Sequence, residues 1–218
     1  MQFPVRFGQY LLVLLFLSVP ATSLAGDQWI LTQSRKGILI YSRTSKSSTL
    51  LAFKGQLTIK APPHKILSVL FDNYLQTLWV RNLKESRVLK RIDAHERYVY
   101  QHYSLPWFVT DRDFVIHIKV SKDKLGLLHI RIKSIDLSTA PKSVGIRARI
   151  ISSHFTLKKS PDGKNTQVSL EIEGDPKGWL PDWLKSDIQK NWAYNTLKDL
   201  RSQSLKSSLK SYPLPKQN

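Results

Sequence analysis

The sequence predicts an α+β protein in which a curved antiparallel β-sheet wraps around one long C-terminal α-helix and leaves an internal cavity. Three observations lead to this fold class. The middle of the chain alternates apolar and polar residues with a period of two, and the region after residue 180 has a helical period. The length of 218 residues with 41% hydrophobic content suits one ordinary globular domain.

The alternating segments predict strands with one buried face. In the best of them, Phe114, Ile116 and Ile118 would face inward while His117 and Lys119 face outward. The same alternation recurs in the segments 51–59, 128–132, 146–150 and 168–173. We expect these strands to form an antiparallel meander. Residues 98–103 also form a predicted strand, but aromatic side chains on both parities hide which face is buried.

Two segments have a helical period. The first is short, from Pro62 to Asp72. The second runs from Pro181 to about Leu209 and places one apolar stripe along its length, made of Leu180, Trp183, Leu184, Ile188, Trp192, Leu197 and Leu200. Pro181 suits the first helical turn, so the helix begins there. A curved sheet that closes on a single long helix is a helix-grip fold, and this fold tends to leave a hollow between sheet and helix.

The N-terminus reads as a secretory signal peptide over residues 1–25. Arg6 precedes an apolar run, Leu11 to Leu17, that is about half the roughly 20 residues a membrane span needs. Small residues, Ser23 and Ala25, stand before a cleavage site after residue 25. An uncleaved membrane anchor is the alternative. We therefore expect an exported protein, periplasmic in a Gram-negative bacterium, with a domain over residues 26–209 and a polar tail over 210–218.

The composition narrows the classes of function. The sequence has no cysteine, which removes disulfides, thiolate metal sites and thiol nucleophiles. Its 34 Lys and Arg against 16 Asp and Glu give a formal charge of +18, which attracts either polyanions or anionic lipid. Export favours lipid, because nucleic acid is scarce outside the cytoplasm.

Three motifs together resemble the START domain, the steroidogenic acute regulatory protein-related lipid-transfer family. Trp79 precedes Glu85-Ser86 and Val88-Leu89; the second motif is the run from Leu105 to Val115, and the third is Asp175-Pro176-Lys177-Gly178-Trp179-Leu180-Pro181, ahead of the last helix. The resemblance spans about Trp29 to Arg201. It implies a helix-grip fold whose cavity holds one lipid. The sequence itself offers no positive support for enzymatic catalysis, and no cofactor is expected. The resemblance also implies a cavity cation, here Arg112, paired in the family to a carboxylate on the preceding strand, where this chain offers Gln101 and His102 instead.

Strand parity supports an inward Arg112 independently of the family. A buried guanidinium needs partners for its five donors, so Arg112 either orients a ligand's polar head or is held by neighbouring backbone alone. Asp111 and Asp113 fit ion-pair partners better than a metal or acid–base pair, and Asp113 would point outward.

The other predicted lipid-binding residues lie beside the motifs. They are His102, Trp107, Trp179, Leu180 and Trp183. Trp183 could instead pack in the core, and Trp179 could be an exposed residue at a bilayer interface. We expect the connection Asp136 to Gly145 to act as a lid over the cavity. No Gly-x-Ser-x-Gly sequence of a serine hydrolase occurs.

The outward parity of the predicted sheet gathers basic residues. As a membrane-docking face we expect Lys119, Arg131, Lys133, Arg147 and Arg149. An ordinary solvated face is the alternative reading. The sequence therefore predicts a monomeric carrier or sensor of one lipid or other hydrophobic molecule that visits anionic membranes and binds no metal and no nucleic acid. An enzyme of the cyclase or aromatase type using the same cavity, and an adaptor acting through the basic face, are the alternatives.

Overall fold

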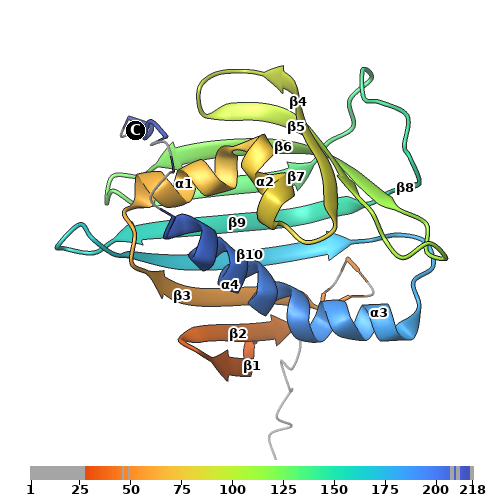
Figure 1. Ribbon diagram of the computed structural model, residues 1–218, viewed down its shortest axis with the longest axis horizontal. Helices are drawn as coiled ribbons and strands as arrows, with labels where there is room; N and C mark the ends of the chain where they lie inside the picture. The colour runs from red at the N-terminus through yellow and green to blue at the C-terminus, as the bar shows by residue number, and fades with distance from the viewer. Residues whose placement is uncertain (1–27, 46, 49, 207–208, 210–211, 217–218) are drawn as a thin grey trace, which may run out of the picture.

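The computed structural model describes residues 28–45, 47–48, 50–206, 209 and 212–216, so the predicted signal peptide lies outside the described residues. Within them, one large antiparallel sheet dominates the molecule (Figure 1). Its strands follow the order β1 (Ile30–Arg35), β2 (Ile38–Arg43), β3 (Ala52–Ile59), β10 (Thr166–Asp175), β9 (Arg149–Lys159), β7 (Leu128–Ser134), β6 (Arg112–Lys122), β5 (Glu96–Tyr103) and β4 (Leu83–Arg91). A two-residue strand, β8 (Ile146–Arg147), pairs in parallel with the start of β6.

The helices lie across one face of this sheet (Figure 1). Two short ones, α1 (Pro63–Phe71) and α2 (Asn73–Trp79), follow β3 and meet at Asp72, whose side chain caps α2 by accepting a hydrogen bond from Leu75 N at 3.0 Å. The C-terminal helix is continuous through α3 (Asp182–Asp187), a π-helical turn η1 (Ile188–Trp192) and α4 (Ala193–Ser204). The predicted curved sheet and long C-terminal helix are therefore confirmed. The predicted end at Leu209 is wrong, because the helix stops at Ser204.

The sheet has an inner face toward the helices and an outer face. Along β6 the inner face carries Arg112, Phe114, Ile116 and Ile118, as the parity predicted. Because paired residues share a face, Tyr103 and Gln101 of β5 are also inner, since they pair with Arg112 and Phe114. This register places the neighbouring His102 and Asp113, which pair with each other, on the outer face.

The core forms where α4 presses onto the sheet. Leu197 and Leu200 are fully buried against β2 and β3. Gly55 in β3 permits this approach, because a Cβ at residue 55 would overlap the Leu197 side chain. No helix among the described residues is long and apolar enough to cross a bilayer.

The segment after the helix also contributes to the core. Leu209 and Tyr212 pack against it, with the Tyr212 ring 4.8 Å from that of Phe71 in an edge-to-face arrangement. The Tyr212 hydroxyl donates to the carbonyl oxygen of Ala94. The described part of the predicted polar tail is therefore anchored to the domain rather than solvated along its whole length.

Candidate functional site

A cavity of about 640 Å³ lies between the C-terminal helix and the inner face of the sheet. The apolar part of the sheet's contribution is Phe53, Phe114, Ile150 and Ile172, and its polar part includes Tyr103, Arg112, Arg149 and Asp175. The helix contributes a stripe along all three of its parts, made of Leu184, Asp187, Ile188, Trp192, Asn195, Thr196 and Asp199. Most of the wall is apolar, so the cavity suits a ligand with hydrocarbon character. The predicted internal cavity is present.

The cavity exists because the two halves of the C-terminal helix pack differently. The α4 half sits directly on β2 and β3 through Leu197. The α3 half instead belongs to a small apolar cluster of its own, formed by Val109, Leu180 and Leu184 with Leu105 and Ile188 against them. The π turn η1 joins the halves and carries Ile188 and Trp192 in the cavity wall.

Arg112 lies in the cavity wall at the start of β6, and its side chain is held by main-chain carbonyls. Nε donates to Pro176 O at 3.1 Å, and Nη2 donates to Lys177 O and Trp179 O, both at 2.9 Å. Nη1 donates to Thr110 O. Burial lowers the pKa of Arg112, while the nearby Asp111 charge opposes this. Three of the five donors therefore fix the connection before α3 and a fourth binds the residue two positions earlier in the chain, which fits the alternative of an arginine held by backbone.

His102 does not line the cavity, so its predicted place among the lipid-binding residues is not supported by its position. The register of β5 and β6 turns it to the outer face, where Nε2 lies 2.7 Å from Asp111 Oδ2. Asp111 Oδ1 also accepts a hydrogen bond from Leu105 N at 2.8 Å. Burial alone would raise the pKa of Asp111, but these hydrogen bonds lower it overall. The inner residue that the sequence missed is Tyr103, which lines the cavity and whose buried hydroxyl has a raised pKa because of desolvation.

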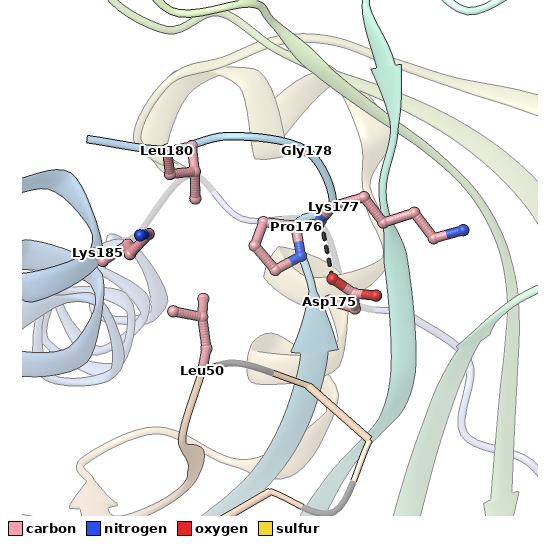
Figure 2. Close-up of a pocket in the computed structure, with 7 residues that line it drawn as sticks. All are labelled: Leu50, Asp175, Pro176, Lys177, Gly178, Leu180 and Lys185. Carbon is pink, nitrogen blue, oxygen red and sulfur yellow. Dashed lines mark hydrogen bonds between the residues drawn. The ribbon is translucent and has the colours of Figure 1, made fainter. Parts of the chain in front are cut away.

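A smaller pocket of about 440 Å³ adjoins the cavity (Figure 2). The two share part of their walls, namely Leu50, Asp175, Pro176 and Leu180. Figure 2 shows this pocket between Leu50, the connection from β10 to α3, and Lys185 of α3; Asp175 Oδ1 accepts the hydrogen bond from Lys177 N at 2.9 Å. The connection that Arg112 holds therefore contributes to the walls of both the cavity and the smaller pocket.

The tryptophans predicted to bind lipid are not in the cavity wall. Trp107 is 95% exposed, Trp179 69% and Trp183 53%. Of the predicted lipid-binding residues, Arg112 and Leu180 line the cavity. The tryptophans lie outside it because the wall is built by their neighbours, Leu105, Leu180 and Leu184.

Asp113 forms an ion pair, as the sequence predicted, and the structure identifies its partner as Arg147. Asp113 points to the outer face as predicted, yet it is fully buried, because it binds Arg147 Nε at 2.6 Å, Ser143 Oγ at 3.0 Å and Val144 N at 3.1 Å. These bonds attach the connection 136–145 to the outer face. That connection contributes no residue to the cavity wall, so its prediction as the cavity lid is not supported by its position.

The predicted docking cations are partly neutralised. Arg147 pairs with Asp113, Lys119 with Glu96 at 2.8 Å, and Arg149 with Asp136 at 2.9 Å. Arg149 also borders the cavity, whereas we predicted it on the outer face. Among the described residues, Arg131 and Lys133 of β7 form no ion pair. The outer face is thus less positive than its sequence indicates.

The histidines on the outer face are bound to neighbours. His117 Nε2 lies 2.7 Å from Glu96, and His129 lies 3.0 Å from both Asp123 and His154. Among the described residues, no group of three or more His, Cys, Asp and Glu side chains is placed to hold a metal ion.

Comparisons with known proteins agree with this geometry. The START domain family model matches residues 21–208. An uncharacterized protein of Pseudomonas aeruginosa is 30% identical over 185 residues, covering 84% of this chain and 90% of the relative. Mouse phosphatidylcholine transfer protein is 24% identical over 183 residues, with 82% of this chain and 84% of the relative covered.

Solved structures give the same result. The crystal structure of a STAR-related lipid transfer protein fragment from Xanthomonas axonopodis has a TM-score of 0.70 at 29% identity, covering 83% of this chain and all of the fragment. Human StAR-related lipid transfer protein 5 shares the fold, with a TM-score of 0.73 at 14% identity over 84% of this chain and 88% of its own. The match over most of the sequence, together with the cavity under the C-terminal helix, means that this chain belongs to the START domain family.

Proposed function

We propose that the protein is a non-enzymatic carrier that binds one lipid in the cavity and transfers it within the cell envelope. The observation that supports this most directly is the apolar cavity of about 640 Å³ between helix and sheet. This volume lies inside the roughly 300–1,000 Å³ range of small-molecule sites. Burial of hydrocarbon at ~25 cal/mol per Å² would drive binding.

The names of the relatives support the ligand class. The mouse relative is called a phosphatidylcholine transfer protein, and the Xanthomonas structure is of a STAR-related lipid transfer protein. The signal-like N-terminus supports export to the periplasm of a Gram-negative bacterium, where the carrier would act as a monomer and contact membranes transiently. N-terminal sequencing of the protein recovered from the periplasm should begin at Gly26; recovery of the full-length chain in membranes would contradict export by cleavage.

The ligand is tested by organic extraction of the purified mature protein followed by mass spectrometry. A lipid near one-to-one stoichiometry supports the carrier. An empty cavity with turnover of a polyketide-like chain supports the cyclase or aromatase alternative, and a chain that neither holds lipid nor turns over substrate supports the adaptor.

A cavity-filling variant makes the test specific to this site. Ile172 lines the cavity, so Ile172→Trp should lower the amount of bound lipid by filling its space. Thr58→Trp is the matched control, because Thr58 is exposed on the outer side of the neighbouring strand β3. Equal lipid content in both variants would mean that the ligand binds elsewhere.

A further inference from the structure

The smaller pocket beside the cavity differs from the cavity in its chemistry. The two hollows share four wall residues, Leu50, Asp175, Pro176 and Leu180. The residues that line the smaller pocket alone are Lys177, Gly178 and Lys185. Two of these three are cations, whereas most of the cavity wall is apolar. Two adjoining hollows of this kind suit an amphiphile, with its hydrocarbon in one and its polar group in the other.

The arginines of the cavity wall already have partners. Arg81 pairs with Asp199 at 3.0 Å, and Arg149 pairs with Asp136 at 2.9 Å. Arg112 gives four of its donors to main-chain carbonyl oxygens. A charged part of a ligand is therefore better placed in the smaller pocket than against these arginines.

The segment 175–180, which lines both hollows, is held in place by the protein itself. Arg112 donates to three carbonyl oxygens of this segment. Gly178 has a φ of +61°, and a Cβ at this position would overlap the side chain of Ile146, so the segment is packed closely against β8. A wall that is already ordered lowers the entropic cost of binding a polar group.

Two charged side chains of the smaller pocket can bind a polar group. Asp175 accepts a hydrogen bond from Lys177 N at 2.9 Å through Oδ1, and within the described part of the chain its carboxylate has no ion pair. Lys185 Nζ lies 3.0 Å from Asp182 Oδ1, but the Asp182 side chain is 96% exposed, and such a surface pair is weak. Figure 2 shows the Lys177 side chain extending away from Leu50 and Lys185. The pocket thus offers one carboxylate, Asp175, and one ammonium, Lys185.

The two groups select the chemistry of a lipid head. An ammonium binds a phosphate, and a carboxylate binds a group with an N–H or O–H donor. The heads of ethanolamine and glycerol phospholipids carry both features, whereas the trimethylammonium group of choline has no N–H or O–H. We infer that the smaller pocket is the headgroup site of a glycerophospholipid whose acyl chains lie in the cavity, and that it selects ethanolamine or glycerol heads over choline. Lys185 contacts the phosphate and Asp175 contacts the donor. This inference rests on the proposed function, because it assigns a head to the lipid that the carrier binds.

The experiment incubates the mature protein with vesicles that contain equal amounts of phosphatidylcholine, phosphatidylethanolamine, phosphatidylglycerol and diacylglycerol. All four carry the same deuterated acyl chains, so their masses differ from those of any lipid already bound. The protein is then separated from the vesicles, and its lipid is extracted and identified by mass spectrometry. The ethanolamine and glycerol phospholipids should each be taken up at least about tenfold above phosphatidylcholine, which corresponds to one hydrogen bond to a charged group. Equal or preferential uptake of phosphatidylcholine would overturn the inference.

The variant Asp175→Asn tests the contact to the donor. Asparagine keeps an oxygen for Lys177 N but loses the negative charge. The preference for ethanolamine over choline should fall about tenfold, and that for glycerol should fall less, because a hydroxyl can still donate to the amide oxygen. Glu171→Gln is the matched control, since Glu171 lies on the outer side of the same strand and pairs with Lys54. An unchanged preference in Asp175→Asn, or an equal change in the control, would overturn the inference.

The variant Lys185→Gln tests the contact to the phosphate. It should lower the uptake of all three phospholipids about fivefold relative to diacylglycerol, which has no phosphate. Lys190→Gln is the matched control, because Lys190 is exposed on the same helix and lines neither hollow. The inference fails if both lysine variants lose phospholipid to the same extent.

A soluble molecule could supply the same head chemistry, and a competition arm separates the two sources. Glycerophosphoethanolamine carries the phosphate and the amine without acyl chains, so it should not displace the labelled lipid. Displacement would assign the pocket to a soluble phosphodiester and overturn the inference. Failure of the two proposals is also distinguishable. Absence of every lipid from the unmodified protein contradicts the carrier function and the headgroup site together, whereas bound lipid whose head composition ignores both variants contradicts the headgroup site alone.

Discussion

Replacing Arg112 distinguishes a clamp on the cavity wall from a ligand for the lipid headgroup. The guanidinium bonds to the carbonyl oxygens of Thr110, Pro176, Lys177 and Trp179, which leaves one N–H donor for a ligand. In Arg112→Leu all four carbonyls lose their donor. We expect the β10–α3 connection to loosen in this variant while the sheet and α4 remain folded.

The size of the effect follows from the number of bonds. Four hydrogen bonds at a net ~0.5–1.5 kcal/mol each sum to ~2–6 kcal/mol, and removing a desolvated charge offsets part of this. A loss of ~2–3 kcal/mol is the expected result, which corresponds to roughly 30- to 150-fold faster opening of this connection. The loss in Arg112→Lys should lie between zero, for the unmodified protein, and the value for Arg112→Leu, because one ammonium cannot reproduce the planar fork of a guanidinium.

The assay is hydrogen exchange over residues 175–185, measured by mass spectrometry. Urea unfolding and lipid extraction of the same variants accompany it. Arg131→Leu is the control, since Arg131 is an exposed arginine on the outer face. Faster exchange in this segment with the same lipid species bound would support the clamp. Unchanged exchange together with a different set of bound lipids would refute it and would make Arg112 a headgroup ligand.

Three further predictions concern stability. Gly55→Ala should destabilise the fold by ~1–3 kcal/mol in urea unfolding, because its Cβ would overlap Leu197, whereas Gly174→Ala, with its nearest contact at 3.5 Å, should be close to neutral; equal effects would remove the close-approach argument. Burial alone would raise the pKa of Asp113, but hydrogen bonds from Arg147, Ser143 and Val144 N lower this pKa overall. The Asp113 carboxylate therefore stabilises the fold fully above about pH 4, and this stabilisation is lost as the pH falls through the lowered pKa of the folded protein. Urea midpoints between about pH 2.5 and 6 should therefore vary less in Asp113→Asn, and an unaltered pH dependence would contradict this assignment. Tyr212→Ala should lower stability by ~1–2 kcal/mol in thermal unfolding because it removes the ring packed on Phe71; no change would mean that the tail is only a solvated extension.

The sequence predicted most of the strands that have one buried face, but it missed β2, whose residues alternate between buried and half-buried. β6, β7 and β10 alternate clearly because the inner face is covered by helices. β1 is an edge strand whose residues are nearly all exposed, so no alternation marks it. β4, at the other edge, has bulges that break its period.

The helical segments show the same limit. α2 has only seven residues and follows α1 after a single capping residue, too short for a period to be read. The π turn in the C-terminal helix leaves no signal in composition. The end at Ser204 could not be located because the following residues, rich in Ser and Lys, would also fit a solvated helix.

For the site, parity placed Arg112 correctly, but three of its four partners lie 64 to 67 residues later in the chain, and all four are main-chain carbonyls, which carry no side-chain signal. His102 was misplaced because its strand has aromatics on both parities, and only the pairing with Asp113 fixes its face. The exposure of Trp107 has one weak signal, a Pro-Trp-Phe sequence in a connection without alternation.

One short motif at the start of β6 holds the connections at the end of the sheet where the cavity lies. Successive residues of a strand point to opposite faces, so Arg112 acts on the inner face and Asp113 on the outer. Arg112 holds the β10–α3 connection, which carries Trp179, and Asp113 holds residues 143–147, which lead into β9. Asp111, directly before them, closes the loop that carries Trp107. Three consecutive charged residues thus set the positions of the three connections at one end of the sheet, and an exchange of any one of them should disturb the connection on its own face before it disturbs the core.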